Sequence, residues 1–170
     1  VFKDFDPYVP RHLRQPKFLF LANIDPDLQY NVLRQVKRPK LVACDSMNYW
    51  ITTKRKSLEK LLDKIDMLLL NDAEARQFSG EYNLIKAAQQ IIAYGPKAVI
   101  IKRGEHGVLY FSKNAHFVAP AYLLETVYDP TGAGDTFAGG MVGYISRSKK
   151  ISEAAIRKGI IYGSIMASFA

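Results

Sequence analysis

The chain has 170 residues, of which 48% are hydrophobic, and this is enough for one core. No shift in composition marks a second domain, so we expect a single domain over residues 1–170. Lysine and arginine exceed aspartate and glutamate by 24 to 16, which gives a formal net charge of +8. The basic clusters at 54–56 and 147–150 lie beside predicted helix ends and lack an aromatic RNA-binding motif, which argues against a nucleic-acid partner.

Further features of the sequence bear on the cellular compartment of the protein. No apolar run approaches the roughly 18 residues of a membrane span, so we expect no membrane partner. The single Cys44 cannot form a disulfide within the chain, which favours the reducing cytoplasm. The chain begins with Val1 and shows no signal-peptide pattern, so we expect it to be part of a longer protein.

Short apolar runs alternate with amphipathic segments along most of the chain. Residues 1–16 contain three prolines and are expected to be irregular. Strands are predicted at 17–22, 40–45, 65–70 and 98–102, followed by a hairpin strand at 108–111. Helices are predicted at 25–37, 57–63 and 83–94, from 135 onward, and at 151–167. This alternation indicates an α/β fold with a mainly parallel sheet covered by helices on both faces.

Polar residues follow two of the predicted strands. Asp45 ends the second strand and Asn48 comes three residues later, while Asn71 follows the third strand and Glu74 comes three residues after it. Because open α/β sheets bind ligands at the carboxyl ends of their strands, Asp45 and Asn48 are candidate site residues. Each pair also has a structural explanation, the first as turn residues and the second as a helix-capping pair.

The most informative stretch is residues 129–140, DPTGAGDTFAGG. Pro130 fixes an extended turn, the loop 132–134 carries almost no side chains, and an apolar helical pattern begins at Asp135. The first amides of a helix have no intrahelical partner, so this loop predicts a phosphate-binding helix start. Asp135 can then take the proton of an attacking alcohol while the amides stabilise the phosphoryl group. The alternative is a tight glycine turn with Asp135 as a helix cap.

Residues 129–140 closely resemble the C-terminal signature of the ribokinase-like (PfkB) family of carbohydrate and nucleoside kinases. The resemblance implies that Asp135 is the catalytic base. It also implies that the backbone amides of Gly132, Ala133 and Gly134 form the anion hole. Some family members bind a monovalent cation through the Asp and Thr before the first glycine, which implies a K⁺ site at Asp129 and Thr131.

The same resemblance implies roles for residues outside this signature. Asn71 and Glu74 match an Asn-x-x-Glu motif in which the Glu organises Mg²⁺ and its waters near the ATP phosphates, a role that suits an ion that keeps its waters. Asp45 and Asn48 are expected near the region of phosphate transfer. The nucleotide-binding residues that the resemblance implies are Lys102, Arg103, Gly104 and Gly107 around a Gly-x-x-Gly turn, and Gly163 and Ser164 beside the adenine pocket.

The resemblance runs from about Leu19 to Ala170 but covers only the C-terminal half of a usual member. It implies a ribokinase-like three-layer α/β/α sandwich whose N-terminal part and lid are absent. The expected activity is ATP-dependent phosphoryl transfer to a sugar hydroxyl, with ATP and Mg²⁺ as cofactors and a small sugar as partner. A nucleoside (adenosine-type) kinase and a nucleotide-binding module without turnover remain alternatives. We expect the 170 residues alone to be inactive, and to self-associate as a homo-oligomer or show low stability.

Overall fold

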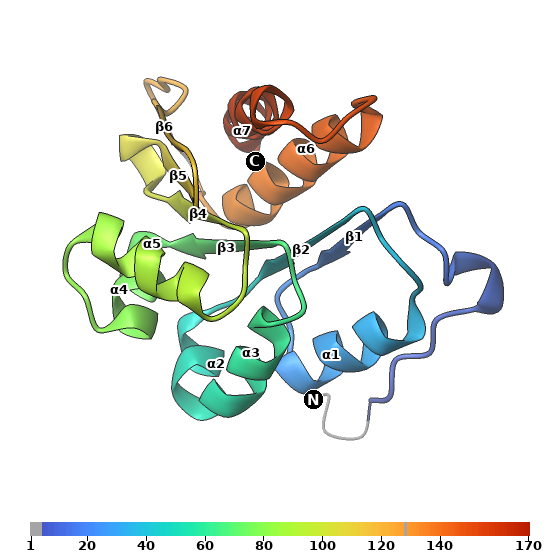
Figure 1. Cartoon of the computed structure of the whole chain (residues 1–170). Coiled ribbons are helices and arrows are strands. Elements are labelled where there is room, and N and C mark those ends of the chain that lie inside the picture. Colours follow the sequence, from blue (N-terminus) through green and yellow to red (C-terminus); the bar gives the residue numbers. More distant parts are fainter. Residues whose placement is uncertain (1–4, 128) are drawn as a thin grey trace.

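The computed structural model describes residues 5–127 and 129–170, and six strands of this part of the chain form one sheet (Figure 1). The strands lie in chain order across the sheet, as β1 Phe18–Leu21, β2 Leu41–Asp45, β3 Met67–Asn71, β4 Ala98–Lys102, β5 Val108–Ser112 and β6 His116–Ala119. Strands β1 to β4 are parallel, whereas β5 and β6 each pair antiparallel with the strand before them. The prediction of a mainly parallel sheet with a final hairpin is confirmed.

Helices cover both faces of the sheet (Figure 1). One face carries α1 Pro26–Gln35, α2 Asn48–Thr53, α3 Arg55–Leu62, α4 Asp72–Ser79 and α5 Leu84–Ala93. The other face carries α6 Ala133–Arg147 and α7 Glu153–Ala167. Two short 3-10 helices complete the described elements, η1 Arg11–Leu13 and η2 Gly104–His106. The predicted three-layer α/β/α sandwich is therefore confirmed.

The alternation of side chains along each strand divides the apolar residues between two cores. In β3, Leu68 and Leu70 pack into the core under α2 to α5, while Met67 and Leu69 pack into the core that contains Met141 of α6. A strand buried on both faces needs apolar residues at every position. This is why β2, β3 and β4 appear in the sequence as continuous apolar runs.

Local polar contacts fix most helix starts where the sequence predicts them. The Asp25 carboxylate accepts a hydrogen bond from the Asp27 amide at the start of α1, and the Ser152 hydroxyl accepts one from the Ala155 amide at the start of α7. Helix α1 ends at Gln35, two residues before the predicted end, because the chain becomes extended at Val36. Helix α2 was not predicted, since six residues are too short to show an apolar repeat.

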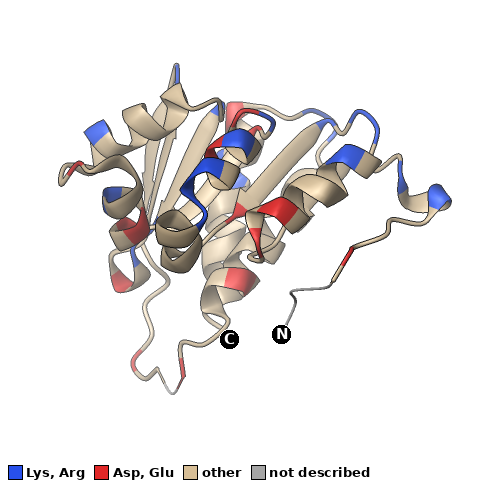
Figure 2. Ribbon diagram, turned by 90° about the horizontal axis from the view of Figure 1, so that it is seen from below, with Lys and Arg blue, Asp and Glu red and all other residues tan. Residues whose placement is uncertain are grey.

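The topology brings several chain segments to one edge of the sheet. Because β1 to β4 are parallel, their carboxyl ends meet at this edge, and α6 begins beside it. Elsewhere, Lys and Arg are interspersed with Asp and Glu over the helices and loops (Figure 2). None of the helices in the described part of the chain is both long and apolar enough to span a membrane.

Candidate active site

An open cavity of about 230 Å³ lies at the edge where the carboxyl ends of β1 to β4 meet the first turn of α6. It is lined by Asn23, Asp45, Ser46, Met47, Asn71, Glu74, Lys102, Gly132, Gly134 and Asp135. Seven of these residues were singled out from the sequence, and they come from four separate segments of the chain. The fold therefore brings seven of the sixteen predicted site residues together in one cavity.

Helix α6 begins at Ala133, two residues earlier than the sequence pattern indicates. Gly132 is its cap, with a left-handed φ of 83° that suits glycine, and the Gly132 carbonyl accepts the first helical hydrogen bond from the Thr136 amide at 2.8 Å. The Ala133 amide, one of the three amides predicted for the anion hole, donates to the Pro130 carbonyl at 3.1 Å. The amides of Gly134 and Asp135 lie in the first turn, where N–H groups have no partner within the helix. The exposed side chain of Asp135 is thus next to two amides that can face an anion.

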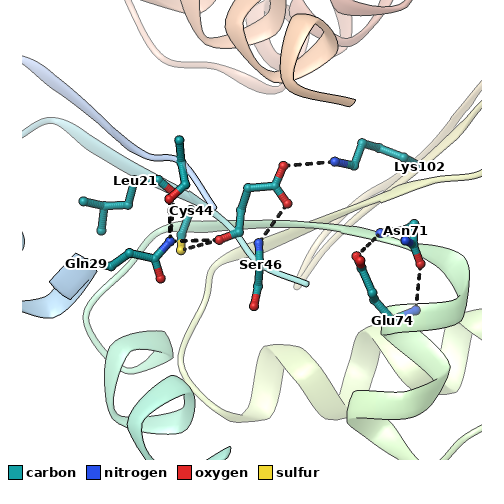
Figure 3. A network of polar contacts seen from close by, with 9 residues as sticks. Leu21, Gln29, Cys44, Ser46, Asn71, Glu74 and Lys102 are labelled. Atoms are coloured by element: carbon teal, nitrogen blue, oxygen red, sulfur yellow. Dashed lines mark hydrogen bonds and ion pairs between the residues drawn. The ribbon is translucent and has the colours of Figure 1, made fainter. Parts of the chain in front are cut away.

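Lys102 and Asp45 form a largely buried ion pair across the cavity (Figure 3). Lys102 ends β4 and Asp45 ends β2, and the Lys102 Nζ lies 3.0 Å from Asp45 Oδ2. The other carboxylate oxygen of Asp45 accepts a hydrogen bond from the Ser46 amide at 2.8 Å. Burial raises the pKa of Asp45, and the nearby positive charge of Lys102 opposes this effect. Lys102 and the Ser46 amide therefore both favour the charged form of this buried carboxylate.

Asn71 and Glu74 form the capping pair that the sequence suggests (Figure 3). The Asn71 side chain accepts a hydrogen bond from the Glu74 amide, and Glu74 Oε2 accepts one from the Asn71 amide, both at 2.8 Å. Burial raises the pKa of Glu74, while the Asn71 amide and the charge of Lys102 lower it. Glu74 thus caps α4 and also lines the cavity.

Four predicted residues follow cavity-lining residues in the chain but do not line the cavity themselves. Asn48 begins α2 with an exposed side chain, and its backbone amide helps to lower the pKa of Glu74. Arg103 follows β4 and has a buried Nε without a hydrogen-bond partner among the described residues. Gly104 and Gly107 close the turn after it, since the Gly107 amide donates to the Gly104 carbonyl at 3.0 Å. A side chain at Gly107 would overlap the backbone of Ala119, so this glycine has a packing reason as well.

The remaining predicted residues also lie outside the cavity wall. Asp129 and Thr131 form an exposed turn, in which the Thr131 amide donates to Asp129 Oδ1 at 2.8 Å, and hydrogen bonds from Thr131 lower the pKa of Asp129. Gly163 lies between α7 and α6, where an added Cβ would be 2.7 Å from the Phe137 carbonyl oxygen. Ser164 has a buried hydroxyl without a partner in the described chain. Close packing of the two helices is a sufficient reason for glycine at 163.

The sequence patterns do not predict three residues of the cavity wall. Asn23, Ser46 and Met47 follow β1 and β2, so they occupy the same strand-end positions as Asp45 and Asn71. Asn23 accepts a hydrogen bond from the Trp50 indole at 3.0 Å, which orients its amide. Ser46 has a buried hydroxyl that finds no partner in residues 5–127 and 129–170. The signal for Asn23 was present, because it is the first polar residue after a predicted strand.

The oxygen atoms of this wall fit a magnesium ion shared with a nucleotide. Magnesium is commonly bound through one or two carboxylates, waters and substrate phosphate oxygens. The buried carboxylate of Glu74 lines the cavity, and a hydrogen bond from the Asn71 amide to Oε2 orients it. In the described residues no cluster of three or more Asp, Glu, His or Cys side chains is arranged to hold a metal.

Comparison with known proteins agrees with this fold. The family model described as pfkB family carbohydrate kinase matches residues 13–168, so the chain belongs to that family. Its relatives include a cytidine kinase of Thermococcus kodakarensis, 28% identical over 155 residues, and a ribokinase of Staphylococcus aureus, 33% identical over 95 residues. The cytidine kinase match covers 89% of this chain and 55% of the relative, and the ribokinase match covers 53% and 31%.

Solved structures share the fold. An aminoimidazole riboside kinase from Salmonella enterica matches with a TM-score of 0.77 and 20% identity, over 92% of this chain and 57% of that one. A putative ribokinase II from E. coli in complex with ATP and Mg²⁺ matches with a TM-score of 0.69 and 22% identity, over 87% and 51%. The matched region thus spans little more than half the length of these solved structures and of the cytidine kinase.

Proposed function

We propose that the protein transfers the γ-phosphoryl group of ATP to a hydroxyl group of a sugar. The observation that carries this proposal is the single cavity that joins Asp135 and the α6 amides to Lys102 and the Asn71–Glu74 pair. An alcohol-activating carboxylate, anion-binding amides, a cation and a magnesium-compatible carboxylate are the groups that phosphoryl transfer requires. Their joint presence argues against a nucleotide-binding module without turnover.

In the proposed reaction Asp135 is the general base. The acceptor oxygen forms a bond to the γ-phosphorus while the bond from that phosphorus to the β,γ-bridging oxygen breaks, and ADP leaves with the electron pair. The hydroxyl proton passes to the Asp135 carboxylate. The amides of Gly134 and Asp135 stabilise negative charge on the phosphoryl group. Magnesium, where bound, neutralises phosphate charge, and Glu74 is the residue of this chain that would orient it.

A nucleoside is the second candidate acceptor. The cytidine kinase match extends over 89% of this chain, compared with 53% for the ribokinase match. Both acceptors present a sugar hydroxyl, so the groups of the cavity serve either reaction. The choice between them depends on residues that contact the rest of the acceptor.

The test is an ATP-consumption assay on the full-length protein with a panel of sugars and nucleosides, followed by mass determination of the product. A phosphorylated sugar is the expected result. Phosphorylation of nucleosides alone would replace the first candidate by the second. ATP binding without any phosphorylated product would leave only the nucleotide-binding module.

A further inference from the structure

The Lys102 side chain is held in place rather than solvated. Its ammonium is 3.0 Å from Asp45 Oδ2, and 18% of the side chain is exposed. Lys97, directly before the other end of β4, also pairs with an aspartate, but 81% of its side chain is exposed. The two lysines therefore differ in burial although both are paired. Of these two lysines, Lys102 lines the cavity, and its ammonium is held there by Asp45.

That point lies against the first turn of α6. A Cβ added to Gly134 would lie 3.2 Å from Lys102 Nζ, so the ammonium occupies the space that a side chain at Gly134 would need. The fixed positive charge is thereby brought to the same turn that presents the amides of Gly134 and Asp135. Two kinds of anion-stabilising group, an ammonium and helix-start amides, converge on one location.

Asp45 contacts Lys102 directly, and little of its side chain is exposed to a ligand. Its side chain is 5% exposed, Oδ2 pairs with Lys102, and Oδ1 accepts from the Ser46 amide. Both oxygens are therefore engaged by the protein. A Lys ammonium has three donors, so pairing with Asp45 leaves two for phosphate oxygens.

We propose that Asp45 is a positioning residue that holds the Lys102 ammonium against the first turn of α6, where it contacts the γ-phosphoryl group during transfer. This inference rests on the proposed phosphoryl transfer. Lys102 forms no covalent bond and exchanges no proton; it stabilises charge on the oxygens of the phosphoryl group. Asp45 acts only by fixing where that charge lies.

The test combines Lys102→Met, Asp45→Asn and the double variant in the full-length protein, with Lys97→Met as the matched control. Dissociation constants for ATP and ADP are measured by calorimetry with magnesium and without acceptor, and kcat is measured with the best acceptor. Lys102→Met is expected to weaken ATP binding about tenfold more than ADP binding and to lower kcat roughly 100-fold. Lys97→Met is expected to leave all of these values unchanged.

The double variant identifies how Asp45 acts. Asp45→Asn is expected to lower kcat about tenfold when Lys102 is present and to have no further effect in the Lys102→Met background. An equal effect in both backgrounds, as for a direct metal ligand, would overturn the positioning role. Equal weakening of ATP and ADP by Lys102→Met would overturn the contact with the γ-phosphoryl group.

Unfolding and nucleotide affinity are measured as well, so that a variant that misfolds is distinguished from one that has lost a contact. Urea unfolding midpoints of all variants are compared, because removing one partner of a buried pair leaves an unpaired charge. The double variant leaves no unpaired charge, so it serves as the test if a single variant misfolds. The proposal then requires that the double variant weakens ATP binding more than ADP binding. Failure to phosphorylate any acceptor would reject the proposed function while the ATP and ADP affinities still test Lys102. A wild-type protein that binds neither nucleotide would overturn both.

Discussion

Asp135 is exposed in the first turn of α6, where its carboxylate can meet an incoming hydroxyl group. We predict that Asp135→Asn in the full-length protein lowers kcat by about 10²- to 10⁴-fold, the range typical of general base catalysis. The amide is isosteric with the carboxylate, so ATP affinity is expected to change little. Steady-state kinetics and calorimetry measure the two effects separately.

A matched control for this variant is Asp63→Asn, an exposed aspartate at the end of α3 that lies outside the cavity wall. It is expected to leave kcat unchanged. A kcat for Asp135→Asn within a few-fold of the wild-type value would remove Asp135 from the role of base and leave it as a helix-start residue.

Glu74 is both a capping residue and the proposed magnesium organiser, and glutamine separates the two roles. A Gln side chain can accept the Asn71 hydrogen bond as Glu does, so the capping box survives in Glu74→Gln. Burial raises the pKa of Glu74, which means that its charged form is less favourable in the folded than in the unfolded protein. Removing the charge is therefore expected to leave the unfolding free energy equal or higher.

For the same variant we predict that the magnesium concentration for half-maximal rate rises roughly tenfold. Glu74→Ala serves as the comparison, because it also loses the cap and should lower the unfolding free energy by about 1 kcal/mol. A magnesium titration of Glu74→Gln that coincides with the wild type would leave Glu74 with a capping role alone.

At the scale of elements, the contact between α6 and α7 depends on glycines at their interface. A Cβ at Gly163 would lie 2.7 Å from the Phe137 carbonyl oxygen and 3.1 Å from the Met141 Cβ. We predict that Gly163→Ala lowers the unfolding free energy by about 1–3 kcal/mol, because the helices must move apart. Chemical denaturation of the purified protein measures the change.

The same pair of helices offers a control in Gly139 of α6, where an added Cβ meets no atom within 4 Å. Gly139→Ala is expected to raise the unfolding free energy by roughly 0.5–1 kcal/mol, since alanine favours the helix. Equal effects of the two substitutions would show that helix propensity, and not helix packing, explains Gly163.

At the scale of the whole molecule, the described sheet ends at β1, whose outer edge has no paired strand among the described residues. Phe18, Leu19 and Phe20 on this strand are only half-buried. Unpaired apolar edges associate with other chains. We predict that the 170-residue chain alone sediments with a mass that increases with concentration.

The 170-residue chain is also expected to bind nucleotide weakly and to transfer no phosphoryl group. It spans 55% of the length of the cytidine kinase, so acceptor contacts supplied by the rest of such a protein are outside it. Calorimetry with ATP and product analysis with the acceptor panel test this. A monomer that phosphorylates a sugar without added sequence would contradict both expectations for the isolated chain.

Features set by neighbours in the chain were predictable from the sequence. The strands and most helices follow from apolar runs, from caps such as Asp25 and Ser152, and from the capping pair Asn71–Glu74. The loop 132–134 also points to its chemistry, because small residues before a helix leave its first amides accessible. Each of these signals lies within a few residues, where the chain itself limits the geometry.

The contacts between distant segments were decided only by the tertiary structure. Lys102 and Asp45 are 57 positions apart, and they pair because β2, β3 and β4 are neighbours whose carboxyl ends share one edge. Asn23 joins the same cavity for this reason, while Gly163 is used for helix packing. The sequence by itself determined most of the elements and pointed to residues that are suited to phosphoryl chemistry. Their meeting in one cavity depends on strand order and helix placement, which minimise exposed apolar area over the whole chain and leave no local mark in the sequence.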